Sequence, residues 1–322
     1  QILYYIGIGG FMSFNHFLGL FYVGMCYFLV GSSYPIAQNA MSNIPTWSFM
    51  FITFLIATLF LLPFSIYMDK TNWLKIGLKS WRDLSILSLL GAVLYTYFLL
   101  YGMEGTSAVT ASVITSSAPI LVLILSIFFL KERSSTHKII SILLAISSIL
   151  VMTLPDQMNE GKGSSFIGLI LISLSTLSNA LNIIYSKKIS SNLQPLTLAT
   201  GVCFMGCLFS FPLSFNEVDH IKVGLLYENI LIFLYYGVLV WAIPYMLFFK
   251  GINFISASSA GMCVALIPFS AMISSIFIFD YSLKTTDFFA IFLIILSIIV
   301  SEFKYSRKNK SCKASIQTPT QP

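Results

Sequence analysis

Long apolar runs separated by short polar breaks recur along the whole chain. Each run is close to the roughly 20 residues that a helix needs to cross a bilayer, and backbone groups in lipid must be hydrogen-bonded within the segment. A transmembrane barrel would alternate in polarity, whereas residues 121–130 are mostly apolar on every side. The pattern predicts an all-α integral membrane protein with ten transmembrane helices, at residues 17–38, 46–67, 84–102, 107–130, 138–154, 165–186, 193–214, 229–249, 255–279 and 287–303.

The composition excludes an ordinary soluble protein. Only 9% of the residues are charged and the mean hydropathy is +0.87, against about 25% charged residues in soluble domains. The net charge of +6 comes from loops and a basic tail, so we expect membrane lipid and no nucleic acid as a partner. The five cysteines lack the spacing of a disulfide framework or a zinc site, and we expect no metal and no cofactor.

The distribution of basic residues predicts an orientation. If the amino terminus is cytoplasmic, 15 of the 18 Lys and Arg residues fall on the cytoplasmic side, and only Lys162, Lys222 and Lys284 fall outside. Basic residues concentrate in cytoplasmic loops. We therefore expect both termini in the cytoplasm, in a bacterial inner membrane or a plasma membrane.

The chain also contains an internal repeat. An offset of 149 residues aligns Gly102 with Gly251 and Pro119 with Pro268. A unit of five spans is odd, so the second copy enters the membrane upside down, as in many secondary transporters. We expect two inverted five-helix repeats at residues 12–154 and 164–303, after a dispensable extension at 1–11 and before a disordered cytoplasmic tail at 304–322.

Three short motifs lie in order along the first repeat. The first span ends in Val30-Gly31-Ser32-Ser33-Tyr34-Pro35, the fourth runs from Ala108 through Ala118-Pro119, and Leu130-Lys131-Glu132-Arg133 follows it. Their sequence and spacing resemble the drug/metabolite transporter superfamily, in its EamA-type branch. Val30 stands where that family has tryptophan, and the second repeat, at Phe279-Asp280-Tyr281, lacks the Lys-Glu pair.

This resemblance implies a secondary transporter that moves a small organic metabolite or drug-like compound by alternating access. The spans carry no acid or base near their middle. A multiply charged solute would need a charged partner there, so a neutral or zwitterionic solute such as an amino acid fits better.

Polar and aromatic side chains within the spans are the best candidates for solute contacts. We expect them around a cavity near the bilayer midplane, where inverted repeats share a site. Asn179 and Asn182 lie on one helix face; they either contact solute or clamp a neighbouring helix, and the sequence leaves both interpretations open. The candidates are Ser32, Ser33, Tyr34, Tyr95, Asn179, Asn182, Tyr235, Trp241 and Ser259.

Four prolines lie within spans or near their ends: Pro35, Pro119, Pro244 and Pro268. Proline removes a helix hydrogen bond and bends the helix. The freed carbonyls either line a cavity, or the bends only shape the bundle.

Other classes of membrane protein fit less well. The three histidines are scattered and no catalytic or metal-binding arrangement is visible, so we expect no enzyme. No ring of charges or filter of carbonyls indicates a channel. A non-transporting scaffold or accessory subunit is the main alternative to a transporter, and a homodimer is compatible with the sequence.

Overall fold

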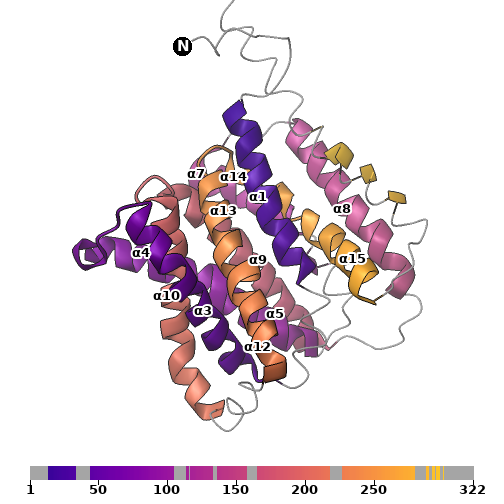
Figure 1. The fold of residues 1–322 in the computed structure, drawn as a ribbon. Helices are drawn as coiled ribbons and strands as arrows, with labels where there is room; N and C mark the ends of the chain where they lie inside the picture. The colour runs from indigo at the N-terminus through magenta and orange to yellow at the C-terminus, as the bar shows by residue number, and fades with distance from the viewer. Residues whose placement is uncertain are drawn as a thin grey trace, which may run out of the picture.

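The computed structural model describes residues 14–33, 44–104, 114–115, 117–132, 136–157, 165–217 and 227–279, with a few positions between 288 and 300. Every regular element in this part of the chain is helical, and Figure 1 shows these helices packed side by side. The expected extension at 1–11, the tail at 304–322, and Tyr34 and Pro35 lie outside the described residues.

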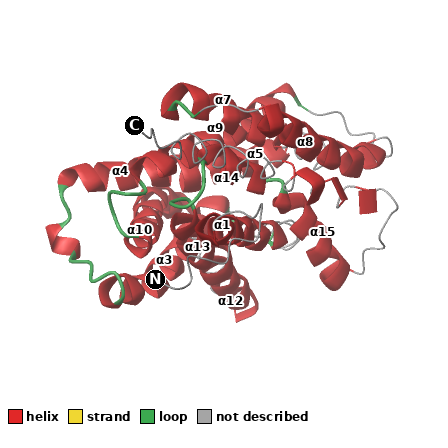
Figure 2. Cartoon of the chain, turned by 90° about the horizontal axis from the view of Figure 1, so that it is seen from above, coloured by secondary structure: helices red, strands yellow, loops and turns green. Residues whose placement is uncertain are grey.

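The elements fall into two series along the chain. The first contains α1 (Phe14–Ser32), α3 (Thr46–Tyr67), η2 (Trp73–Lys75), α4 (Leu78–Ser88), η3 (Leu89–Leu94), α5 (Tyr95–Glu104), α7 (Ala118–Leu130) and α8 (Thr136–Gln157). The second contains α9 (Phe166–Ile189), α10 (Pro195–Ser214), η4 (Phe215–Glu217), α12 (Tyr227–Leu234), η5 (Tyr235–Ala242), α13 (Ile243–Gly251), α14 (Ala257–Cys263) and α15 (Leu266–Phe279). From above, α8 lies at the edge of the bundle opposite α4 and α10 (Figure 2).

Seven helical stretches of the described chain are long and apolar enough to cross a membrane, and Ala118–Leu130 and Thr136–Ser148 are shorter apolar helices. The prediction of a multi-pass helical membrane protein is confirmed. The last expected span, 287–303, lies mostly outside the described residues, so the number ten remains a prediction. The helix that contains the third expected span begins at Leu78, before residue 84. In its second turn, the buried carboxylate of Asp83 accepts a 2.8 Å bond from Tyr185, so this acid need not face water.

The offset of 149 residues extends over elements that the sequence comparison did not use. It carries Thr46, the first residue of α3, onto Pro195, the first residue of α10. It also superposes much of η3 and η5, two π-helical segments that interrupt the third and eighth spans. The internal repeat is therefore present in the secondary structure as well as in the sequence.

The helix contacts follow the same repeat. Helix α1 packs against α13 and α15, and its counterpart α9 packs against α5 and α7. Helix α3 packs along its own counterpart, α10, and Figure 1 shows the two side by side. A two-repeat architecture organises the described part of the bundle.

Both ends of the α3–α10 pair are closed by a carboxylate. Asp69, just after α3, accepts bonds from the backbone nitrogen and Oγ1 of Thr197 at the start of α10, at 2.9 and 3.2 Å. Glu217, just after α10, accepts bonds from the backbone nitrogen and Oγ of Ser48 at the start of α3, both at 2.9 Å. Each carboxylate satisfies the free donors of a helix start, and the two contacts show that α3 and α10 run antiparallel.

The prolines divide into two groups. Pro119 and Pro268 lie in the first turn of α7 and α15, where a missing N–H costs little. Pro244 is the second residue of α13, just after η5 within the continuous helix Asn229–Gly251, so a carbonyl one turn earlier lacks its usual donor. Pro63 and Pro212, which the sequence analysis did not select, lie inside α3 and α10, 149 residues apart.

Two repeat-related glycines allow helices to approach closely. A Cβ on Gly102 would lie 2.7 Å from Cγ1 of Ile172, and one on Gly251 would lie 2.7 Å from Cγ2 of Val23. Val23 and Ile172 are themselves 149 residues apart. Small residues at such contacts let transmembrane helices pack tightly.

Replacing Gly251 by valine should destabilise the α1–α13 contact by about 1–3 kcal/mol, because the added side chain overlaps Val23 and the backbone of α1. The expected result is a lower midpoint of thermal unfolding in detergent, measured by size-exclusion chromatography of heated samples. Gly77→Ala is the matched control, since a Cβ there meets nothing within 4 Å. Equal midpoints for the two variants would contradict the close contact.

Candidate functional site

Trp241 lies where the two repeats meet. It is in η5 and packs against Phe54 of α3, with ring centroids 4.6 Å apart, in a cluster that includes Ala92 and Val93 of η3. Ala92 and Trp241 are 149 residues apart, so equivalent positions of the two repeats lie in one cluster. π-Helical segments within longer helices are frequent at functional sites.

The indole of Trp241 has an unused hydrogen-bond donor. Its Nε1 is buried and has no partner among the described residues. Below it, the ring stacks on Tyr245 at 5.9 Å, and Tyr245 stacks on Phe249 at 5.9 Å. A buried N–H without an acceptor costs about 1–3 kcal/mol, which a bound solute with a carbonyl or carboxylate oxygen would recover.

Two hydroxyl groups of the third span also lack a hydrogen-bond partner among the described residues. Oγ of Ser88 and Oγ1 of Thr96 are buried without a partner in the described structure. They flank η3, and Thr96 is 149 residues from Tyr245. The sequence analysis missed both; their separation by eight residues, which places them near one face of a helix, was the available signal.

Tyr95 connects to this region through its phenol. The phenol is close enough to those of Tyr27 and Tyr245 for electrostatic interaction. Its backbone carbonyl accepts a 2.9 Å bond from Oγ of Ser175. The structure therefore places two of the expected site residues, Tyr95 and Trp241, in the region of Tyr245.

The two asparagines of α9 differ in environment. Asn182 is 6% exposed and lies over the backbone of η3, since a Cβ on Gly91 would be 2.5 Å from its Cγ. One turn away, Oγ of Ser178 donates a 2.8 Å bond to the carbonyl of Leu90. This placement favours the helix-clamp interpretation for Asn182, whereas Asn179 is half-buried on the same helix.

Ser32, Ser33 and Tyr235 lie together at one end of the bundle. Oγ of Ser32 is 3.1 Å from the phenol oxygen of Tyr235, and Tyr236 donates a 2.6 Å bond to the carbonyl of Ser33. These contacts join the end of α1 to the start of η5. These hydrogen bonds therefore hold the end of α1 against the start of η5.

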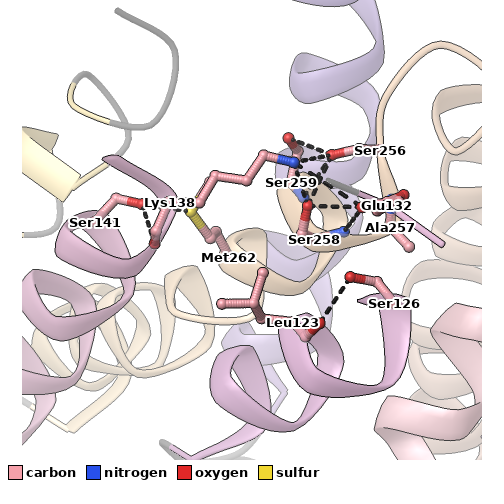
Figure 3. A network of polar contacts seen from close by, with 10 residues as sticks. All are labelled: Leu123, Ser126, Glu132, Lys138, Ser141, Ser256, Ala257, Ser258, Ser259 and Met262. Atoms are coloured by element: carbon pink, nitrogen blue, oxygen red, sulfur yellow. Dashed lines mark hydrogen bonds and ion pairs between the residues drawn. The ribbon is translucent and has the colours of Figure 1, made fainter. Parts of the chain in front are cut away.

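Ser259 lies in a polar network at the start of α14, shown in Figure 3. The carboxylate of Glu132 accepts bonds from the backbone nitrogen of Ala257 at 2.8 Å and from Oγ of Ser258 at 2.9 Å. Lys138 donates to Oγ of Ser256 at 3.1 Å and lies 3.9 Å from Glu132. The network joins the end of α7, the start of α8 and the start of α14, and so holds these three helix ends together at one end of the bundle. Ser259 lies in this structural contact, and Glu132 is its central acceptor.

The rings of Phe54, Trp241 and Tyr245 pack on one another where η5 meets α3. A surface pocket of about 460 Å³ lies elsewhere, at the chain segments that follow α3, α9 and α13, and is lined by Asp69, Thr71, Ser190, Ser191, Asn192, Leu193, Gln194, Pro195, Thr197 and Asn253. The midplane cavity itself remains a prediction.

The apolar helices and the internal repeat define a multi-pass membrane protein with a two-repeat architecture. A sequence model described as the EamA-like transporter family matches residues 17–154 and 166–303. The chain belongs to the EamA-like transporter family, and the resemblance found in the sequence is confirmed.

Individual relatives agree with this assignment. The uncharacterized transporter YetK of Bacillus subtilis is 27% identical over 280 residues, which cover 86% of this chain and 84% of that protein. An uncharacterized transporter of Archaeoglobus fulgidus is 33% identical over 135 residues, 41% of this chain and 47% of that one. One crystal structure has a TM-score of 0.70 at 14% identity and covers 89% of this chain and 97% of the other, which shows a shared fold.

Proposed function

We propose that the chain is a secondary transporter that moves a small neutral or zwitterionic organic solute by alternating access. We further propose ten spans in two inverted five-helix repeats, with the solute bound between the π-helical segments η3 and η5. The family and the antiparallel packing of α3 with its counterpart α10 support this organisation.

The observation that carries the proposal is the buried indole N–H of Trp241, which has no acceptor among the residues that the structure describes. Native structures satisfy most buried donors, so an unsatisfied one beside a repeat axis indicates a place for a ligand. Opening of the aromatic stack toward either face would expose this donor in turn, as alternating access requires.

The groups around Trp241 indicate the chemical class of solute. The indole and the phenol of Tyr245 are uncharged, and the rings of Phe54 and Tyr245 pack on the indole. Such a site offers hydrogen-bond donors and aromatic faces. It suits a solute with acceptor oxygens and an apolar or planar part.

A metabolite screen tests this function. Cells that lack the protein, and cells that overproduce it, are compared for the metabolites that they retain and release. Overproduction should change the distribution of a small set of related solutes, and Trp241→Ala should abolish the change. Identical profiles in all strains would favour a scaffold or accessory subunit.

The proposed topology places both termini in the cytoplasm. A single cysteine at residue 43 or 157 should react with a membrane-impermeant maleimide added outside cells, whereas one at residue 79 or 310 should react only after permeabilisation. The physical reason is that 15 of 18 basic residues then lie on the cytoplasmic side. The opposite labelling pattern would contradict this orientation.

A further inference from the structure

The chain between α3 and α4, together with the first residues of α4 (residues 68–82 in all, called the connector below), extends from the edge of the bundle in Figures 1 and 2. Leu74, within η2, is 98% exposed and Leu78 is 87% exposed. The chain has spans on both sides of this connector, so the connector lies at a membrane surface. Exposed leucines there can enter the boundary between headgroups and acyl chains.

Four basic residues accompany these leucines: Lys70, Lys75, Lys79 and Arg82 are all exposed. The two nearest acids, Asp69 within the connector and Asp83 directly after it, are engaged elsewhere. Asp69 accepts bonds from Thr197, and Asp83 accepts one from Tyr185 and another from Arg82. The three lysines therefore present an excess of positive charge beside two apolar side chains.

The backbone at Lys70 adds a second observation. Lys70 has a φ of 53°, and the next residue, Thr71, donates its N–H to the carbonyl of Ser65 at 3.1 Å, which ends α3. Glycine is the usual residue at this left-handed position. A lysine here places a flexible cation at the helix end, on the same connector as Lys75 and Lys79.

Two tryptophans hold the connector against the bundle. Nε1 of Trp73 donates a 3.1 Å bond to Oγ of Ser65 in α3, and the rings of Trp73 and Trp81 lie 5.9 Å apart. Tryptophan concentrates at the interface between headgroups and hydrocarbon. The pair fixes the depth of the connector, so that its lysines stay at the level of lipid phosphates.

We propose that this connector is a binding site for anionic phospholipid. Lys70, Lys75 and Lys79 contact the headgroup phosphates, while Leu74 and Leu78 lie among the upper acyl chains. Lysines close to an anionic membrane surface each contribute about fivefold to binding. Charge complementarity and the exposed leucines favour a lipid over a soluble anion.

Fluorescence quenching by brominated lipid measures the preference directly. The full chain, with Trp47 and Trp241 replaced by phenylalanine so that Trp73 and Trp81 report, is reconstituted in dibrominated phosphatidylcholine with increasing unbrominated phosphatidylglycerol. Displacement of brominated lipid restores the fluorescence and gives a relative binding constant. We expect phosphatidylglycerol to bind at least about fivefold better than phosphatidylcholine.

The variant Lys70→Gln/Lys75→Gln/Lys79→Gln should reduce this ratio to near one. Lys162→Gln/Lys222→Gln/Lys284→Gln removes the same charge from the opposite side of the predicted topology and should leave the ratio unchanged. Leu74→Ser/Leu78→Ser should weaken quenching by brominated phosphatidylcholine without changing the ratio of the two lipids' binding constants. If the triple variant does not fold, the single substitution Lys75→Gln tests the same contact, and it should lower the ratio of phosphatidylglycerol to phosphatidylcholine binding severalfold.

Three results would overturn the proposal. They are a ratio near one for the unaltered connector, the same ratio after loss of its three lysines, and an equal fall in the opposite-side control. Added soluble glycerol phosphate should not change the signal; if it abolished the preference, the connector would bind free phosphate rather than lipid.

Discussion

Replacing Trp241 by alanine is expected to lower the rate of solute transport at least about tenfold, while the amount of folded protein in the membrane stays the same. The change removes the buried donor Nε1 and the stacking partner of Tyr245 together. An aromatic contact and a hydrogen bond each contribute about 1 kcal/mol. Initial rates in cells or vesicles, divided by the quantity of folded protein, give the measurement.

Trp241→Phe separates the two contributions. Phenylalanine keeps a ring against Phe54 but has no N–H, so transport should fall about three- to tenfold rather than disappear. Trp73→Phe is the matched control, because Trp73 packs on Trp81 at 5.9 Å and bonds to Ser65, outside the cluster that contains Phe54 and Trp241. A fully active Trp241→Phe variant would show that the indole N–H does not contribute to transport. A fully active Trp241→Ala variant would show that Trp241 is not part of the solute site.

Glu132→Ala is expected to open the end of the bundle that the Glu132 network closes. Its carboxylate is the acceptor for the backbone nitrogen of Ala257 and for Oγ of Ser258. Loss of an acceptor from partly buried donors costs about 1–3 kcal/mol, enough to shift a two-state equilibrium about five- to 100-fold. The α7–α14 contact should separate more often, and transport should slow because the closed state is less populated.

The rate at which an introduced cysteine reacts with a maleimide measures this opening. In a background without the native cysteines, Ser256→Cys should react several-fold faster with a membrane-impermeant maleimide when Glu132 is alanine. Lys131→Gly is the control: Lys131 has a left-handed backbone with a φ of 54°, which glycine adopts easily, so Glu132 keeps its position. Unchanged reactivity in the Glu132 variant would show that the network does not restrain this end.

The general architecture was predictable because it depends on long-range averages. Apolar run length, the distribution of lysine and arginine, and the matched pair of Gly102 and Gly251 indicated a helical membrane protein with a repeat before any coordinates. The same offset also relates Pro63 to Pro212 and Ser48 to Thr197, but isolated matches in apolar sequence carry little weight until helix ends are known.

The site was predictable only in part. Trp241 stood out because an indole deep in a span fits poorly as an interface anchor, and the structure places it between the repeats. The sequence could not show that Ser259 and Glu132 share a network at one end of the bundle. The bonds that reach Glu132 come from Ala257 and Ser258, 125 and 126 residues away, and Ser259 joins the network through Ser256. It also could not show the π-helical turns of η3 and η5, which have no clear residue signature.

Solute counterflow in reconstituted vesicles tests the central claim most directly. Vesicles that contain the purified protein are loaded with each solute from the metabolite screen, and entry of the same labelled solute is followed. The account predicts transient accumulation above equilibrium for a neutral or zwitterionic solute, absent from empty vesicles and reduced at least about tenfold by Trp241→Ala. Absence of counterflow for every solute of the screen, or equal counterflow in the Trp241→Ala protein, would contradict a carrier whose site lies between η3 and η5.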